Sequence, residues 1–240
     1  MKKILYLIGL VLTVTSFSSC QEDLENWYSE TASYDGRFVV STTCDEYSSD
    51  NTSIADGLEL MFYNSAKNVP NDIWLDVSIA GIHVKGNFQV TGNSEAFTTD
   101  QTVKNAVSST FYIFTPSGSM ASFTQANATG YYGAPKSAGI LIDGLELYAR
   151  VSLLEGKILP DAATSIGGNT ADSVYVKTIL HSDYVKIESY QTPNKDWKVQ
   201  GVPEFAWRVK SGSNTPAAAE DWDEHWTLSG YRYTGMPEDR

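Results

Sequence analysis

Few side chains in this sequence could carry out chemistry by themselves. The 240 residues contain three histidines, His83, His181 and His225, and two cysteines, Cys20 and Cys44. A serine hydrolase needs a histidine as general base, and on an α/β scaffold it also needs a G-x-S-x-G turn that exposes the nucleophile. That pentapeptide is absent. His83 shares one face of its strand with Lys85 and Asn87 and is expected to face solvent. His181 is expected to end a strand, beside a turn at Ser182-Asp183. The sequence therefore predicts no catalytic residue.

The densest polar cluster is Asp221-Trp222-Asp223-Glu224-His225. Carboxylates together with an imidazole can bind a divalent metal. Zinc sites, however, prefer sets of cysteine and histidine, and calcium loops need a glycine at the sharp turn and a closing bidentate glutamate. Neither pattern is present, so we expect a solvated acidic loop that leads into a strand, with no metal and no cofactor.

Cys20 ends a stretch that is typical of a secretion signal. Lys2-Lys3 precede an apolar run over residues 4–14, which is too short to span a bilayer as a helix. Phe17-Ser18-Ser19-Cys20 resembles a bacterial lipobox, in which the cysteine is acylated and becomes the mature N-terminus. We therefore predict a signal peptide over residues 1–19, an acylated tether over 20–33 and a folded domain over 34–240. Cys44 would then have no disulfide partner, and we expect it to be buried and unreactive.

The excess of acidic residues and the run that follows Cys20 indicate which partners and which location to expect. Gln21-Glu22-Asp23 resembles the surface-export signal of Bacteroidetes lipoproteins, and a solvated acidic linker would look the same. The chain has 29 acidic residues against 17 basic ones, of which Lys2 and Lys3 leave with the signal. Nucleic acid is therefore not expected as a partner, because its binding relies on Lys and Arg. We predict an outer-membrane lipoprotein whose membrane contact is the lipid on Cys20, and a surface-exposed one if the acidic run is an export signal.

Alternation of apolar and polar residues dominates the rest of the chain and predicts strands. The expected strands are Arg37–Thr43, Gly57–Tyr63, Asp72–Ile79, Ile82–Val90, Ser109–Thr115, Gly139–Arg150, Val151–Leu159, Val174–His181, Val185–Glu188, Phe205–Lys210 and Trp226–Thr234. Asp100–Val107 is expected to form a short helix, and Pro116–Pro135 a long loop that carries aromatic residues. Many short strands separated by turn signals favour an all-β fold, a single antiparallel calycin-like barrel with long loops.

Four segments resemble a known family. Tyr34–Val40 looks like its opening strand, Asn71–Asp76 is similar to its "IWID" segment, and Ala171–Tyr175 is similar to its "ADSIYF" segment. Ser229–Asp239 is similar to the family ending "SGxRxTGxxED", which is the most specific match. On these segments the chain resembles the lipid-binding putative hydrolases found among Bacteroidetes lipoproteins. The resemblance implies a lipocalin-like barrel and an envelope location, but it carries over no catalytic residue, and residues 92–136 have no counterpart in it.

Aromatic side chains are the candidates for ligand contact. A barrel of about eight strands can hold one small ligand, and aromatic residues at its mouth could contact it. The candidates are Trp74, Tyr131, Tyr132, Trp207 and Trp222. Each of them could equally belong to the core. We predict non-catalytic binding of a small hydrophobic or amphipathic ligand. The alternatives are a surface glycan-binding accessory protein, a packed structural or interaction protein, and a hydrolase whose site the sequence does not reveal.

The lipid anchor can be tested directly. Replacing Cys20 by serine removes the thiol that would carry the diacylglycerol, so we expect the variant to leave the membrane fraction for the aqueous phase of a detergent partition. Intact mass spectrometry should show the loss of the acyl chains. Replacing Cys44 by serine is the matched control and should leave both results unchanged. A Cys20→Ser chain that still partitions with the membrane would contradict the lipobox assignment.

Overall fold

The computed structural model describes residues 29–47, 55–79, 81–104, 107, 110–193, 203–218 and 222–239. Cys20, the signal sequence and residues 20–28 of the predicted tether lie outside this part of the chain. The strands are β1 (Gly36–Cys44), β2 (Ala55–Asn64), β3 (Asp72–Ile79), β4 (Ile82–Gln89), β5 (Thr91–Asn93), β6 (Ala96–Thr98), β7 (Thr102–Lys104), β8 (Thr110–Phe114), β9 (Met120–Ser122), β10 (Leu141–Thr164), β11 (Thr170–Gln191), β12 (Phe205–Val209), β13 (Thr215–Pro216) and β14 (Glu224–Arg232). One short helix, α2 (Gln125–Tyr132), and a 3₁₀ turn, η1 (Pro237–Asp239), complete the described elements.

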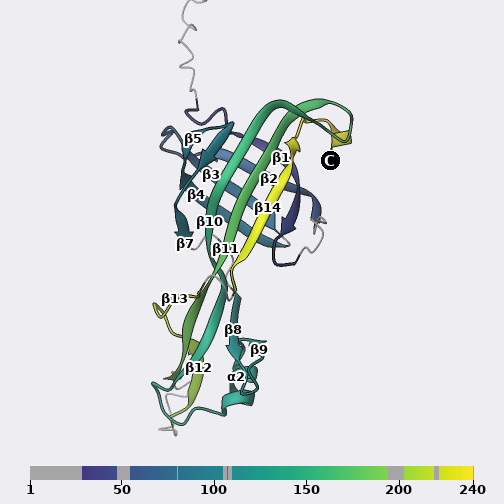
Figure 1. Ribbon diagram of the computed structural model, residues 1–240. Coiled ribbons are helices and arrows are strands. Elements are labelled where there is room, and N and C mark those ends of the chain that lie inside the picture. Colours follow the sequence, from purple (N-terminus) through teal and green to yellow (C-terminus); the bar gives the residue numbers. More distant parts are fainter. Residues whose placement is uncertain are drawn as a thin grey trace, which may run out of the picture.

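All fourteen strands belong to one antiparallel sheet, which confirms the all-β class. Its main path runs β4-β3-β2-β1-β14-β11-β10-β6-β5. The sheet curls into a barrel in which β1 to β4 lie across from β10, β11 and β14 (Figure 1). The curl brings β4 round towards β7, which pairs with β10, and Val84 makes an isolated antiparallel bridge to Val107.

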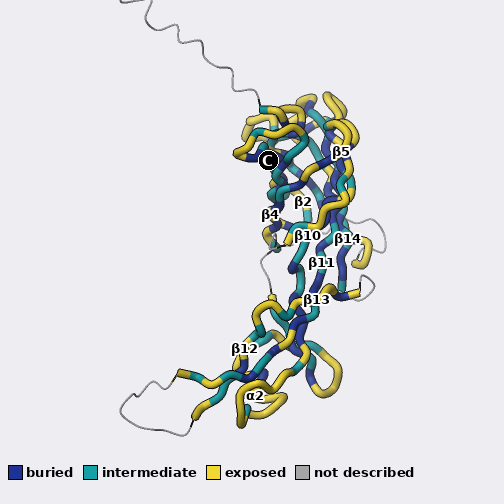
Figure 2. The backbone as a smooth tube through the Cα atoms, turned by 90° about the vertical axis from the view of Figure 1, so that its left-hand side faces the viewer, coloured by how far each residue is buried: buried dark blue, intermediate teal, exposed yellow. Residues whose placement is uncertain are grey.

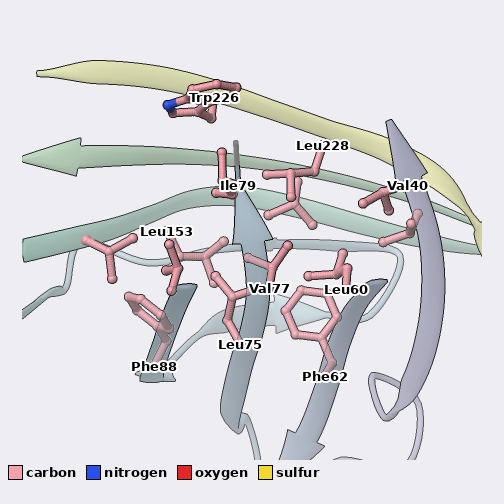
Figure 3. Packing of buried hydrophobic residues seen from close by; sticks show 14 of the residues in the cluster. Val40, Leu60, Phe62, Leu75, Val77, Ile79, Phe88, Leu153, Trp226 and Leu228 are labelled. Carbon is pink, nitrogen blue, oxygen red and sulfur yellow. The ribbon is translucent and has the colours of Figure 1, made fainter. Parts of the chain in front are cut away.

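The barrel interior is filled with side chains. Alternate residues of each strand point inward, as the period of two requires; β1, for example, buries Phe38, Val40, Thr42 and Cys44. Figure 3 shows the packed layer, with Leu60, Phe62, Leu75, Val77, Ile79, Phe88, Leu153, Trp226 and Leu228 converging from both sides. The described core therefore resembles a packed interior more than a ligand chamber.

Strands β10 and β11 are far longer than the sequence predicts. The expected boundary between Arg150 and Val151 is wrong, because β10 continues from Leu141 to Thr164 without a turn. A register shift between Glu146 and Arg150 marks the place, and Tyr148 there has a φ of 56°. The alternation of buried and exposed residues changes phase at this bulge, and a bulge bends a strand without ending it. The hairpin thus runs out of the barrel and into a second lobe (Figure 1).

The second lobe, which we call the distal lobe, is built on the ends of β10 and β11 that project from the barrel. Strands β8, β9, β12 and β13 and helix α2 pack there around a small cluster of Ile113, Ala128, Ile187 and Trp207. The expected loop 116–135 therefore contains β9 and α2, whose N-cap Thr124 accepts a hydrogen bond from the Asn127 amide. The expected helix over 100–107 is wrong, because residues 102–104 form β7.

The distal lobe is less buried than the barrel (Figure 2). Most of its chain is exposed or half-buried, and its cluster is a fraction of the size of the barrel core. No helix among the described residues is long and apolar enough to cross a bilayer.

Gly156 tests the packing of the barrel. A methyl group at this position would meet the Phe97 ring at 2.1 Å, and Phe97 is held edge-on between Tyr34 and Phe62, at centroid distances of 5.3 and 6.0 Å. We expect Gly156→Ala to lower the free energy of unfolding by about 1–3 kcal/mol, measured by urea denaturation, because the core cannot take added volume. Gly130→Ala is the control: its methyl group meets open space on α2, so stability should be unchanged or slightly higher.

Candidate functional site at the waist of the sheet

A serine, a histidine and an aspartate meet where the barrel narrows into the distal lobe. We call this region, around Ser152, His181 and Asp223, the waist. Ser152 Oγ lies 2.7 Å from His181 Nε2, and His181 Nδ1 lies 2.7 Å from Asp223 Oδ2. Ser152 lies in β10 and His181 lies in β11. Asp223 is the residue that precedes β14. The arrangement is that of a nucleophile, a base and an orienting carboxylate.

Strand pairing places these three side chains on one face. Val151 and Leu153 point into the barrel core, so Ser152 between them points out. Arg150 pairs with His181, and Leu180 pairs with Glu224, which puts Asp223 beside the histidine. The expected turn at Ser182-Asp183 is wrong, because β11 continues through both residues and His181 lies within it.

Hydrogen bonds fix the orientation of the histidine ring. Asp223 Oδ1 accepts from the Ser182 amide at 3.2 Å, and Ser182 Oγ donates to the Trp222 carbonyl at 3.0 Å, which together hold the carboxylate. A carboxylate only accepts, so in the neutral ring Nδ1 carries the proton and Nε2 is free to accept from the serine hydroxyl. Thr102 Oγ1, 2.8 Å from Ser152 Oγ, then donates to the serine.

A polar cavity of about 380 Å³ begins two residues along β10, at Arg150, and Ser152, His181 and Asp223 are not part of its lining. Its lining includes Lys104, Arg150, Glu146, Asp183 and Asn214. Arg150 Nε donates to Asp183 Oδ1 at 2.7 Å, and its terminal nitrogen donates to the Ser182 carbonyl at 3.3 Å. Both bonds hold the guanidinium at the cavity wall, two residues along β10 from Ser152.

A larger and more apolar cavity, of about 520 Å³, lies in the distal lobe. Phe114, Tyr184 and Val185 provide apolar surface, and Ser213 and Thr215 provide hydroxyls. The ion pair of Asp143 with Lys186 lies at its wall. We call this the distal cavity. It combines apolar walls with a few polar groups, as small-molecule sites do.

The comparisons with known proteins place the chain in a family. A model of the lipid-binding putative hydrolases matches residues 23–237. The chain belongs to this family. The family resemblance of the four sequence segments is thereby confirmed.

Among solved structures, one neighbour is a putative outer membrane protein from Bacteroides fragilis NCTC 9343. It shares 7% identity, the alignment covers 85% of this chain and 100% of the neighbour, and the TM-score is 0.24. A likeness of this strength supports no argument about fold or function. The search of curated proteins gave no match.

The aromatic residues proposed for ligand contact do not lie together at the mouth of the barrel. Trp74 is half-buried on the outer wall of the barrel, where its ring is parallel to that of Tyr63 at 6.3 Å. Trp207 belongs to the core of the distal lobe: its exposed fraction is 2%, and its indole donates to the Gly133 carbonyl at 3.2 Å. Tyr132 packs edge-on against Trp207.

The two remaining candidates also lie apart from each other. Tyr131 is exposed on α2. Trp222 is half-buried at the waist, beside Asp223. The five aromatic candidates thus divide among the outer wall, the distal lobe and the waist.

The other chemical candidates have structural roles. His83 is solvent-facing, as expected, and its ring contacts Asp76 at 2.8 Å. His225 Nδ1 lies 2.7 Å from Glu46 Oε1 at the surface. Among the residues that the structure describes, no group of three or more His, Cys, Asp or Glu side chains is placed to hold a metal ion.

Cys44 is fully buried at the end of β1, as expected. Burial, followed by the hydrogen bond to Glu46, raises the pKa of its thiol to about 12. In a Cys20→Ser background we expect iodoacetamide at pH 8 to leave Cys44 unmodified in the folded chain and to alkylate it in guanidinium, as read by mass spectrometry. A Ser78→Cys control, at an exposed position of β3, should react in both states. Rapid alkylation of native Cys44 would contradict the buried thiol.

Proposed function

We propose that this chain is an envelope lipoprotein, anchored through acyl chains on Cys20, that binds a small hydrophobic or amphipathic molecule in the distal cavity. The observation that carries the proposal is the distal cavity itself, since the barrel core is packed. Membership of a family described as lipid-binding supports the ligand class. Binding at this site requires no covalent step.

The chemistry of the distal cavity suits an amphipathic molecule. Its volume of about 520 Å³ is within the 300–1,000 Å³ range that small-molecule sites occupy. Phe114 and Val185 can cover an apolar chain, while the ammonium of Lys186 and the hydroxyls of Ser213 and Thr215 can take a polar head. Lys186 is also about half exposed, so a charged head group can remain partly hydrated.

The path of the chain supports an anchored arrangement. The first described residues lie at the end of the barrel opposite the distal lobe (Figure 1). A tether that begins at Cys20 would therefore hold the barrel end towards the membrane and leave the distal cavity facing away from it. Outer-membrane location, with the cell surface as its exposed side, is part of this proposal.

Glycan binding is the second candidate, and one observation favours it. Trp74 and Tyr63 form a nearly parallel pair on the outer wall, with an angle of 7° between their rings. Such aromatic surfaces can stack on sugar rings. Lys85 Nζ lies over both rings, at 5.4 and 5.8 Å from their centroids, and would have to move aside. The distal cavity needs no such rearrangement, so it ranks first.

Filling the distal cavity tests the proposal. Thr215→Tyr places a phenol ring in the cavity, and we expect it to weaken binding of the fluorescent fatty acid cis-parinaric acid at least about tenfold, or about 1.4 kcal/mol. Thr91→Tyr, on exposed β5, is the matched control and should bind as the native chain does.

Equal affinity of the native and Thr215→Tyr chains would overturn the distal cavity as the site. A chain that ignores the fatty acid but binds soluble oligosaccharides, and loses that binding on Trp74→Ala, would instead establish the glycan candidate. Calorimetry with both ligand classes separates these outcomes.

A further inference from the structure

We propose that Ser152 is the nucleophile of an esterase site at the waist of the sheet, with His181 as its general base and Asp223 as the residue that positions the base. This site is separate from the distal cavity and adds an activity to the proposed binding function. It is carried by the two 2.7 Å contacts that join β10, β11 and the residue before β14, and by the polar cavity that begins two residues along β10.

The three groups are held in place before any substrate binds. The exposed fraction of the Asp223 side chain is 4% and that of His181 is 15%, so the hydrogen bond between them is shielded from water. Ser182 fixes the second carboxylate oxygen through its amide. Such prior positioning is what a base needs to accept a proton in the transition state.

A substrate would have to reach Ser152 from outside the barrel, past neighbours that are more open than the serine itself. Ser152 itself is 8% exposed, whereas Leu154 two residues further along β10 is 38% exposed. On the other side, Arg150 and Lys104 line the polar cavity. Residues two apart in a strand are about 7 Å apart. An apolar side chain on one side of the hydroxyl, and on the other a cavity lined by Lys104, Arg150 and two carboxylates, therefore flank Ser152.

The flanking groups indicate the substrate class, an ester that joins a short acyl chain to a polar alcohol, because side chains of both charges and the amide of Asn214 line the cavity. Lys104 is exposed at the cavity wall. Arg150 keeps its bond to Asp183 and adds positive charge at the cavity wall. Leu154 offers apolar surface to the acyl chain.

The reaction would proceed by two acyl transfers. Ser152 Oγ attacks the ester carbonyl carbon as its proton passes to His181 Nε2; the carbon–oxygen bond to the alcohol then breaks, and the alcohol leaves with that proton. Water, deprotonated by His181, attacks the acyl-serine carbonyl. The carboxylic acid is released, and the proton returns to Ser152. One ester and one water give one acid and one alcohol.

Side chains must stabilise the charge on the tetrahedral intermediate. The backbone at Ser152 pairs with both neighbouring strands, in register with Thr102 on β7 and Ile179 on β11. It offers no pair of free amides like those of familiar oxyanion holes. The Thr102 hydroxyl, which already lies 2.8 Å from Ser152 Oγ, is the nearest donor. Lys104, two residues along the same strand, supplies a positive charge.

The test uses the full mature chain with 4-nitrophenyl butyrate and a fluorophosphonate probe. We expect measurable hydrolysis and one covalent adduct that tandem mass spectrometry maps to Ser152. Ser152→Ala should lose the adduct and lower kcat/KM at least about 100-fold. Ser229→Ala, an exposed serine on β14, is the matched control and should retain both.

Asp223→Asn distinguishes positioning from a structural role. An asparagine amide would donate to Nδ1 and hold the ring in the wrong tautomer, so kcat should fall about 100-fold or more while KM changes little. An unchanged melting temperature would show that the fold is intact. If a variant does not fold, the fluorophosphonate adduct on Ser152 of the native chain still tests the proposal. An adduct-free Ser152, or hydrolysis that survives Ser152→Ala, would overturn it.

Discussion

The antiparallel pairing of β10 with β11 is the constraint on which the rest of the structure depends. The two strands pair from Leu141 with Glu188 to Thr164 with Thr170. In the barrel they complete the curled wall, and beyond it they form the platform on which β8, β12, β13 and α2 assemble. One hairpin therefore contributes to both hydrophobic clusters and holds the waist site between them. A small lobe with so few buried side chains gains its order from this shared hairpin.

At the waist, the β10–β11 hairpin passes from the barrel core to the core of the distal lobe. Buried polar groups lie at this point. Glu224 accepts from Tyr47 Oη at 2.6 Å, Tyr148 Oη at 2.5 Å and Trp226 Nε1 at 3.0 Å, which satisfies its carboxylate at the end of the barrel. Burial, followed by the hydrogen bond to Glu224, raises the pKa of Tyr148. Asp223, the residue before Glu224, points to the other face and reaches His181. Consecutive carboxylates thus serve the core on one face and the proposed esterase site on the other.

The sequence predicted the barrel strands well because alternation reports directly on a sheet with one buried face. It predicted β3 with the observed bounds and placed Cys44 in the core. It failed at Tyr148, because a bulge disrupts alternation as a turn does, and only pairing with β11 shows that the strand continues. It also failed at 102–104, where cross-strand pairing outweighs a weak helical pattern.

The site residues could not be found in this way, because their contacts join distant parts of the chain. His181 is 29 residues from Ser152 and 42 from Asp223. Only the register of three strands brings them together, and register was not available from alternation alone. Trp207 illustrates the same limit. The sequence shows an aromatic residue in a strand, but no sequence pattern predicts the distal lobe in whose core it lies.

The length of β10 has a consequence for reach. Its 24 residues correspond to about 80 Å of extended chain, far more than the barrel wall needs. If Cys20 is acylated as proposed, the end of the hairpin that bears the distal lobe would lie away from the lipid head groups. A ligand of the distal cavity would then come from the medium or from a neighbouring protein, and the waist site would lie between the distal cavity and the bilayer.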